Sequence, residues 1–367
     1  MTITIRIGDC RELLAAMPDE SVNCIVTSPP YWGLRDYGVA GQIGMEPTLA
    51  QHLEIMVQVF RECRRVLRKD GTCWVNYGDC YATHPNGRSA ADTKATGNDD
   101  RTFRDKPFST IQGTMKPKDL CMIPNRLAIA LQDDGWWVRS EIIWHKLNPM
   151  PDSATDRPTP AHEKMFLLTR SARYWYDADA VRTPLATKTL TTFGTQHRDL
   201  GNDAGDNVKA SNWARSVPVR KPRLKKPDGW DTGAGGHGSV HRHGREKGET
   251  AEVDQLADAN LRNVWSIATA PFSEAHFATF PPALVEPCVK AGCPEGGMVL
   301  DPFGGAGTVG LVADRLKRSA IMFELNPEYA DIAERRIRKD AGMFTDLTVE
   351  RPTTPKPRCR KKPGALA

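Results

Sequence analysis

Residues 297–308 read GMVLDPFGGAGT, an apolar run that leads into a glycine-rich turn. The run is typical of a strand, and the apolar residues that follow in 309–316 continue as a helix. Glycines let a ligand approach the backbone closely, and the N-terminus of a helix adds amide donors and partial positive charge. The stretch therefore predicts a cofactor-binding turn or, on the glycines alone, a simple tight turn.

An acid follows this turn at a position that favours the cofactor. Residues 319–324 read SAIMFE, a further strand that ends in Glu324. Nucleotide-binding folds hold ribose hydroxyls with an acid at the end of the second strand. The turn lacks the third glycine of the dinucleotide fingerprint, so a nicotinamide oxidoreductase is the less favoured interpretation.

The remainder of the chain alternates strand-like and helix-like segments. Strands are predicted at 2–7, 22–26, 72–76, 137–144, 164–169 and 263–267, and helices at 11–17, 49–67, 119–131 and 283–291. This alternation predicts an α/β fold with a mostly parallel sheet and helices on both faces. Two polar segments, 83–118 and 183–258, interrupt it, and long inserts in a compact enzyme are usually binding loops or disordered.

Composition and charge indicate a globular protein. Of the 367 residues, 40% are hydrophobic and 26% are charged, which is enough apolar material for a core. The net charge of +5 only weakly suggests a polyanionic partner. The nine cysteines form no C-x-x-C pair. With neither a signal peptide nor a membrane-length apolar run, a soluble, cytoplasmic protein without a membrane partner is expected.

A second motif lies near the start of the chain. Residues 27–38 read TSPPYWGLRDYG and follow the predicted strand at 22–26. The two prolines stop the strand, and a hydroxyl and several aromatic rings stand beside them. A rigid turn that merely ends the strand is the alternative to a functional role for these residues.

Together the two motifs resemble those of the DNA amino-methyltransferases. DPFGGAGT resembles the family's S-adenosyl-L-methionine motif, and TSPPY resembles its catalytic motif. Gly8-Asp9, Phe323–Tyr329 and His276–Val289 are similar to the strand-end acid, the ribose-binding strand and the helix before the cofactor motif. The catalytic motif comes first, which is the circularly permuted order of the β class. The resemblance covers about 1–82, 119–182 and 260–340.

The resemblance implies a Rossmann-like methyltransferase fold with an inserted target-recognition region. It divides the chain into a catalytic half at 1–82, a polar insert at 83–118, a continuation of the catalytic domain at 119–182, the target-recognition insert at 183–258, and a cofactor-binding half at 259–340. The basic, proline-rich segment 341–367 is expected to be a disordered tail.

The resemblance also assigns roles to individual residues. The expected catalytic residues are Ser28, Pro29, Pro30 and Tyr31. The hydroxyl of Ser28 and the carbonyl of Pro29 would accept the two N–H groups of the target amine, and Tyr31 would stack on a base that has left the duplex. The expected cofactor-binding residues are Asp9, Asp301, Pro302, Phe303, Gly304, Gly305, Gly307, Thr308 and Glu324.

Alternatives remain for three of these residues. Asp301 would orient the glycine turn or reach the methionine ammonium. Phe303 would contact the adenine or the sulfonium, or simply pack in the core. Asp9 would contact the adenine amino group, or cap the helix at 11–17.

The insert at 183–258 is expected to bind double-stranded DNA. Basic residues interleaved with aromatics suit a segment that follows phosphates and reads bases. The predicted DNA-binding residues are Arg220, Lys221, Arg223, Lys225, Lys226, Arg242 and Arg245. His237, His241 and His243 have no matching acids or cysteines, so no metal site is predicted. Cys288 follows a proline, as in carbon-5 cytosine methyltransferases, but its helical context predicts a buried residue.

The target base and the partners follow only from the resemblance. The serine of TSPPY favours cytosine N4, with adenine N6 as the second choice. A catalytically silent nucleic-acid-binding protein, or methylation of RNA or of a protein glutamine, are the more distant alternatives. A homodimer is the family's expectation, and any restriction nuclease would be a separate chain.

Overall fold

The computed structural model describes residues 1–34, 39, 41–84, 108–184, 258–270, 280–341 and 345–352. Among these residues, nine strands form one sheet in the order β11-β1-β10-β9-β2-β3-β5-β4-β8. The strands are β1 (Thr2–Ile7), β2 (Val22–Thr27), β3 (Leu67–Tyr77), β4 (Trp137–Lys146), β5 (His162–Thr169), β8 (Val264–Ile267), β9 (Met298–Asp301), β10 (Ser319–Glu324) and β11 (Asp346–Glu350).

The sheet is mostly parallel, as the sequence predicts. All neighbours from β11 through β3 pair in parallel, β5 runs antiparallel to both β3 and β4, and β8 pairs in parallel with β4. The late strand β9 lies between the early strand β2 and β10. The expected permuted α/β fold is therefore confirmed, and it places the two ends of the chain side by side in the sheet.

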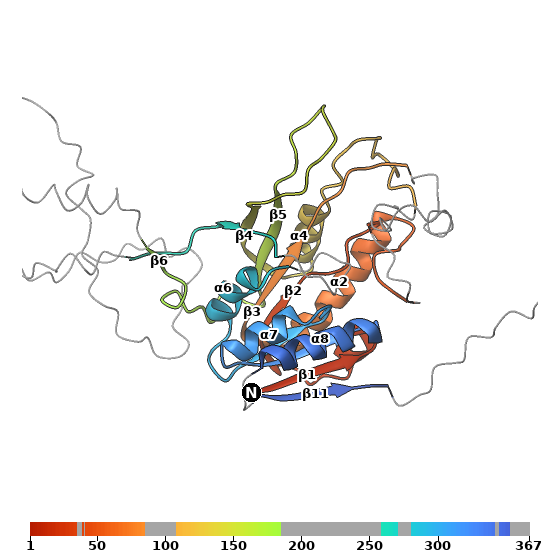
Figure 1. Cartoon of the computed structure of the whole chain (residues 1–367). Coiled ribbons are helices and arrows are strands. Elements are labelled where there is room, and N and C mark those ends of the chain that lie inside the picture. The colour runs from red at the N-terminus through yellow and green to blue at the C-terminus, as the bar shows by residue number, and fades with distance from the viewer. Residues whose placement is uncertain are drawn as a thin grey trace, which may run out of the picture.

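Helices cover both faces of the sheet (Figure 1). One layer holds α1 (Cys10–Ala15), α2 (Leu49–Val66) and α4 (Ile123–Asp133), and the other holds α6 (Pro282–Gly292), α7 (Thr308–Arg315) and α8 (Pro327–Asp340). Successive side chains of a strand point to opposite faces, so Cys24 and Val26 join the core under α6 and α7 while Ile25 joins the core under α2. Burying each Ile or Val side chain contributes about 1.5–3 kcal/mol.

Helix α2 shows how local signals set these elements. The hydroxyl of Thr48 accepts the amide of Gln51 at 3.2 Å and caps the start of the helix. Met56, Phe60 and Cys63 follow at helical spacing and are buried. The helix ends at Val66 and the chain continues directly into β3. Position 71, inside β3, requires a glycine because a Cβ there would be 2.8 Å from the carbonyl oxygen of Asn23.

The prediction that residues 341–367 form a disordered tail is wrong for part of this segment. Asp346–Glu350 forms β11, which pairs in parallel with β1 in the register Thr2↔Asp346. Leu347 and Val349 alternate with polar residues and pack against the core under α8. The edge strand escaped prediction because it is only five residues long and lies next to a basic, proline-rich segment. Residues 353–367 lie outside the described part of the chain.

Two short strands mark the ends of the predicted target-recognition insert. β6 (Thr183–Pro184) pairs antiparallel with β7 (Asp258–Ala259). The chain therefore leaves and re-enters the described fold at one place, and residues 185–257 lie outside the described residues. None of the helices within the described ranges is long and apolar enough to cross a membrane.

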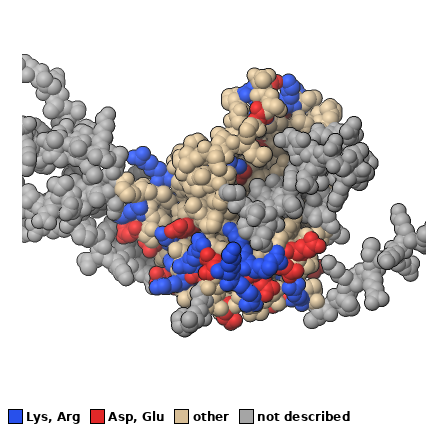
Figure 2. All heavy atoms as spheres, in the orientation of Figure 1, with Lys and Arg blue, Asp and Glu red and all other residues tan. Residues whose placement is uncertain are grey.

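The outer surface over α7 and α8 carries charges of both signs (Figure 2). Several of these form ion pairs, such as Arg315 with Asp340 and Arg338 with Glu334. Interspersed exposed charges of this kind keep a helix soluble and contribute little each to stability.

Candidate active site

Four adjacent parallel strands bring the predicted site residues to one edge of the sheet. The strand ends of β1 and β10 are in register at Ile7↔Glu324, and those of β10 and β9 at Met322↔Asp301. The hydroxyl of Thr27, at the end of β2, donates a 2.7 Å hydrogen bond to Oδ1 of Asp301. This bond places the TSPPY motif beside the glycine turn, although the two lie 274 residues apart in the chain.

Asp301 orients the glycine turn. Its Oδ1 also accepts the amide of Phe303 at 3.0 Å, which fits the first of the two alternatives for this residue. Its Oδ2 is buried and has no hydrogen-bond partner among the described residues. Burial raises the pKa of Asp301 to about 7, against the lowering effect of the bonds from Thr27 and Phe303. An oxygen of this kind can accept a hydrogen bond or a positive charge from a ligand.

Glu324 closes the turn from the neighbouring strand. Its Oε2 accepts the amide of Gly305 at 2.8 Å, and its Oε1 accepts the amide of Asn326 at 2.8 Å. Burial raises the pKa of Glu324 to about 7, although these backbone bonds favour the ionised form. The carboxyl group therefore lies next to the turn, at the strand end where the sequence predicts it.

The three glycines of the turn serve different purposes. A Cβ on Gly304 would lie 2.9 Å from Cβ of Met322, and one on Gly307 would lie 2.9 Å from Cβ of Ala333. These two glycines therefore allow the turn to pack on β10 and α8. A Cβ on Gly305 would have only the carbonyl oxygen of Phe303 near it, at 4.0 Å, so Gly305 is the one of the three that borders open space.

The other expected cofactor residues surround the turn. Pro302 is buried, and Phe303 is partly buried against the core under α2, which fits the packing alternative. The hydroxyl of Thr308 accepts a 2.8 Å hydrogen bond from Arg336 of α8. Asp9 caps α1 through the amide of Arg11 at 2.9 Å and also pairs with the Arg11 guanidinium, so the capping alternative is present in the structure.

Residues 28–31 form a rigid turn at the end of β2, which we call the elbow. Oγ of Ser28 lies 3.4 Å from Oδ1 of Asn76, the residue next to the end of β3. Nδ2 of Asn76 donates to the carbonyl of Lys164 at 3.3 Å, which turns Oδ1 towards the elbow. The Ser28 hydroxyl can therefore donate its proton to Asn76 and keep its lone pairs for a ligand.

Tyr31 is held by residues of β4 and β5. Its hydroxyl donates to Oε2 of Glu163 at 3.0 Å, and Nζ of Lys146 donates to Oε1 of Glu163 at 2.5 Å. A Cβ on Gly78 would lie 2.5 Å from the Tyr31 ring, so this glycine makes room for it. Burial raises the pKa of Tyr31 well above its usual range, which keeps the phenol protonated as a donor.

A family model described as DNA methylase matches residues 22–335. This chain belongs to the DNA methylase family. The resemblance to DNA amino-methyltransferases, carried by TSPPY and DPFGGAGT, is therefore confirmed.

Several members of this family are similar to it. The Type II methyltransferase M.Cfr9I of Citrobacter freundii is 41% identical over 330 residues, covering 90% of this chain and 86% of that protein. M.SmaI of Serratia marcescens, also a Type II methyltransferase, is 38% identical over 333 residues, covering 91% and 90%.

Solved structures share the fold at lower identity. TTHA0409 of Thermus thermophilus, described as a putative DNA modification methylase and solved with S-adenosyl-L-methionine, superposes with a TM-score of 0.53 at 20% identity, covering 96% of this chain and 99% of that one. The cytosine-N4-specific PvuII DNA methyltransferase superposes with a TM-score of 0.54 at 16% identity, covering 95% and 96%. At these identities the likeness concerns the fold.

Sequence reasoning about this DNA methylase missed four residues around the elbow: Asn76, Gly78, Lys146 and Glu163. Asn76 and Lys146 end or nearly end their strands, and Gly78 follows β3 directly, so strand-end position was the available signal. Glu163 lies at the start of β5. It reaches the same edge only because β5 is antiparallel, which the sequence did not reveal.

The predicted DNA-binding residues of this DNA methylase lie outside the described residues. They are Arg220, Lys221, Arg223, Lys225, Lys226, Arg242 and Arg245. His237, His241 and His243, for which no metal site is predicted, also lie outside the described residues. Over α7 and α8, basic side chains alternate with acidic ones (Figure 2), so that part of the described surface is not a one-signed phosphate-binding face.

Cys288 is buried, as the sequence predicts. The thiol has no solvent exposure and lies 3.4 Å from Sδ of Met165, inside the core under α6. Burial raises the pKa of Cys288 well above its usual range, so this thiol is a poor nucleophile. Within the described ranges, no group of His, Cys, Asp and Glu side chains is placed to hold a metal ion.

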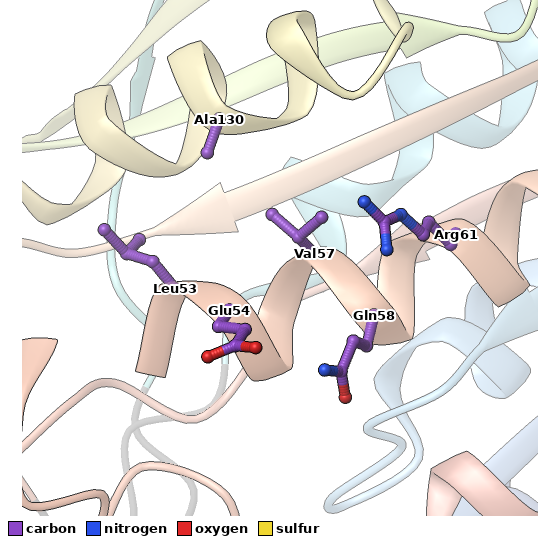
Figure 3. Close-up of a pocket in the computed structure, with 6 residues that line it drawn as sticks. All are labelled: Leu53, Glu54, Val57, Gln58, Arg61 and Ala130. Carbon is purple, nitrogen blue, oxygen red and sulfur yellow. The ribbon is translucent and has the colours of Figure 1, made fainter. Parts of the chain in front are cut away.

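A surface groove lies apart from this site (Figure 3). It has a volume of about 290 Å³ between α2 and α4 and is lined by Leu53, Glu54, Val57, Gln58, Arg61 and Ala130. All of these residues belong to the two helices, and none lies at a strand end. The groove is therefore separate from the candidate site at the sheet edge.

The packing role of Gly307 can be tested against a matched glycine. Gly307 and Gly296 have nearly the same backbone angle, with φ of 76° and 75°, but a Cβ on Gly296 would meet nothing within 4 Å. Gly307→Ala should lower the free energy of unfolding by about 1–3 kcal/mol more than Gly296→Ala, because only Gly307 packs against Ala333. Urea unfolding of both variants measures the difference, and equal losses would contradict the packing role.

Proposed function

We propose that this chain is a site-specific DNA methyltransferase that methylates the exocyclic amino group of a base, cytosine N4 in preference to adenine N6. The observation that carries the proposal is the 2.7 Å bond from Thr27 to Asp301, which holds the elbow beside the glycine turn. Relatives that are 41% and 38% identical over about nine-tenths of the chain are Type II methyltransferases, which supports the same reaction class.

The residues at the glycine turn fit S-adenosyl-L-methionine. This molecule carries two positive charges and ribose hydroxyl donors, and its sulfonium supplies the methyl group. Asp301 offers a buried oxygen without a described partner, and Glu324 offers a carboxyl group at the strand end. Gly305 borders open space where the backbone can be approached. Glu324 would accept the ribose hydroxyls, and Asp301 would hold the turn and offset positive charge.

The elbow would prepare the amine of the base for attack. An exocyclic amino nitrogen is a poor nucleophile because its lone pair is delocalised into the ring. The Ser28 hydroxyl and the Pro29 carbonyl would accept its two N–H groups and favour a pyramidal nitrogen. Asn76 supports this role because it can take the Ser28 proton, and proline has no N–H to compete with its own carbonyl.

Tyr31 would hold the base outside the duplex. Stacking on an aromatic ring contributes about 1–3 kcal/mol per base, comparable with the few kcal/mol lost on unpairing. The bond from its hydroxyl to Glu163 fixes the ring before the base arrives. Correct placement of the amine relative to the methyl donor then contributes as a high effective concentration.

The insert at 183–258 would bind the duplex and select the site. Its two ends meet where β6 pairs with β7, so the insert begins and ends at one place in the described fold. A homodimer and a nuclease on a separate chain are part of the proposal at the level of the family.

The role of Ser28 is tested by Ser28→Ala. The variant should lose about 10–100-fold in the rate of methyl transfer, because one acceptor for the amine is removed, while affinity for S-adenosyl-L-methionine stays within twofold. Transfer of tritium from labelled cofactor gives the rate, and mass spectrometry of the nucleosides gives the base. Near-normal transfer by both Ser28→Ala and Tyr31→Ala would overturn the assignment, and N6-methyladenine in the product would replace cytosine as the target.

Affinity for S-adenosyl-L-methionine should rise with pH. Glu324 and Asp301 have pKa values raised to about 7 by burial, so both are largely protonated at lower pH and ionise as the pH rises through 7. The ionised carboxylates accept hydrogen bonds and offset the positive charge of the cofactor. The dissociation constant for the cofactor should therefore fall between about pH 5.5 and 7.5, a range that lies below the pH at which a free α-amino group loses its proton. Calorimetry across this range should show a weaker dependence for Glu324→Gln; affinity that falls with rising pH would contradict it.

The role of the insert is tested by deleting residues 218–247. The intact chain should bind DNA with an affinity that falls steeply with salt, because lysines and arginines release counterions from the phosphates. The deletion should flatten the slope of log affinity against log salt and abolish site choice, while cofactor affinity is retained. Fluorescence anisotropy with a labelled duplex measures both, and an unchanged slope would exclude this segment.

A further inference from the structure

A buried row of three polar side chains ends on the elbow. Nδ1 of His52 lies 2.8 Å from Oε2 of Glu46, Nε2 of His52 lies 2.7 Å from the hydroxyl of Tyr77, and that hydroxyl donates to the carbonyl of Pro30 at 3.0 Å. His52 and Tyr77 have no solvent exposure, and Glu46 is 8% exposed. We call these three side chains the Glu46–His52–Tyr77 row. The roles proposed for Ser28, Pro29 and Tyr31 do not use it.

The elbow needs an anchor of this kind. Pro29 and Pro30 have no N–H group, so the backbone at these two positions cannot donate hydrogen bonds. The backbone here can therefore be held by a hydrogen bond only through a carbonyl that accepts from a fixed donor. Tyr77 supplies the donor from the last residue of β3, a strand that pairs with β2 along its length.

The number of available protons determines which atom donates in each hydrogen bond of this row. A carbonyl can only accept, so the single proton of the Tyr77 hydroxyl points to Pro30. Nε2 of His52 then donates to the Tyr77 oxygen, and Nδ1 faces Oε2 of Glu46. These two contacts hold the Tyr77 hydroxyl in place against the Pro30 carbonyl.

The surroundings of Glu46 suit an ionised carboxylate. Its two oxygens also accept the amide of Gly44 at 3.1 and 3.0 Å, and hydrogen bonds to a carboxylate favour its ionised form. Burial alone would raise the pKa of Glu46, but the bonds from His52 and Gly44 leave it below its usual range. The same segment is tied to the chain just after the elbow, because Nε1 of Trp32 donates to the Glu46 carbonyl at 2.9 Å.

Tyr77 also supports the ring of Tyr31. The two ring centroids are 4.9 Å apart, with an angle of 33° between the rings. One side chain thus contacts both the carbonyl next to Pro29 and the ring expected to stack on the base. A change at Tyr77 would move both groups together.

We propose that Glu46, His52 and Tyr77 are positioning residues for methyl transfer: Glu46 holds the His52 ring, the ring holds the Tyr77 hydroxyl, and the hydroxyl donates to Pro30 and so fixes the elbow in its reactive geometry. This inference rests on the proposed methyltransferase function.

The first test is Tyr77→Phe, which keeps the ring and removes the hydroxyl. At saturating DNA and cofactor, the single-turnover rate should fall at least tenfold, while the dissociation constants for both stay within twofold. Tyr176→Phe is the matched control, because Tyr176 is a partly buried tyrosine under α6, in the opposite layer, and its rate should be unchanged. A Tyr77→Phe rate within twofold of the unaltered chain would overturn the proposal.

The second test is a double-mutant cycle with Glu46→Gln, which keeps the shape of the side chain and removes its charge. Alone, it should slow transfer at least fivefold; added to Tyr77→Phe, it should slow transfer less than twofold, since the hydroxyl it controls is already gone. Two independent losses that multiply would mean a merely structural role and would overturn the proposal. If Tyr77→Phe does not fold, the same cycle is run with His52→Gln in its place.

A third measurement does not depend on activity. Nitrogen NMR of histidine-labelled protein should show a proton on Nε2 of His52, with a signal that vanishes in His52→Gln. A ring without a proton on Nε2 would overturn the proposed direction of these hydrogen bonds. Failure of the unaltered protein to methylate any DNA, with a proton present on Nε2 of His52, would instead overturn the methyltransferase function and leave the hydrogen-bond direction established.

Discussion

The pairing of β2 with β9 is the constraint on which the site depends. β2 ends in the elbow and β9 ends in the glycine turn, so their parallel alignment sets the distance between the two motifs. The bond from Thr27 to Asp301 fixes that alignment at the strand ends, and the second bond of Asp301, to the amide of Phe303, passes the constraint into the turn. A single buried carboxyl group thus connects both halves of the site.

The elbow is rigid within itself but depends on neighbours for its orientation. Two prolines restrict the backbone and remove its donors. Asn76 and Tyr77 from β3 and Glu163 from β5 supply the polar contacts that the elbow cannot make by itself. A site built on strand ends is held more precisely than one built on free loops, because the strands share one sheet and one core.

Several residues show where local pattern is sufficient and where it is not. The glycine turn was recognisable, yet only Gly305 borders open space, while Gly304 and Gly307 are required by packing on β10 and α8. Asp9 was recognisable as a strand-end acid, yet its described bonds are those of a helix cap. In each case the residue type satisfies two roles, and only its neighbours in space distinguish them.

The sequence by itself determined the alternation of strands and helices, the two motifs and their order, because these depend on residues close together in the chain. It did not determine that β5 runs antiparallel, that Asp346–Glu350 completes the sheet, or that His52 is buried between Glu46 and Tyr77. Strand direction and side-chain partners result from contacts between segments that are distant in the sequence. Hydrophobic periodicity predicts the type of each segment but not which segments contact each other. Only the tertiary structure decided those features.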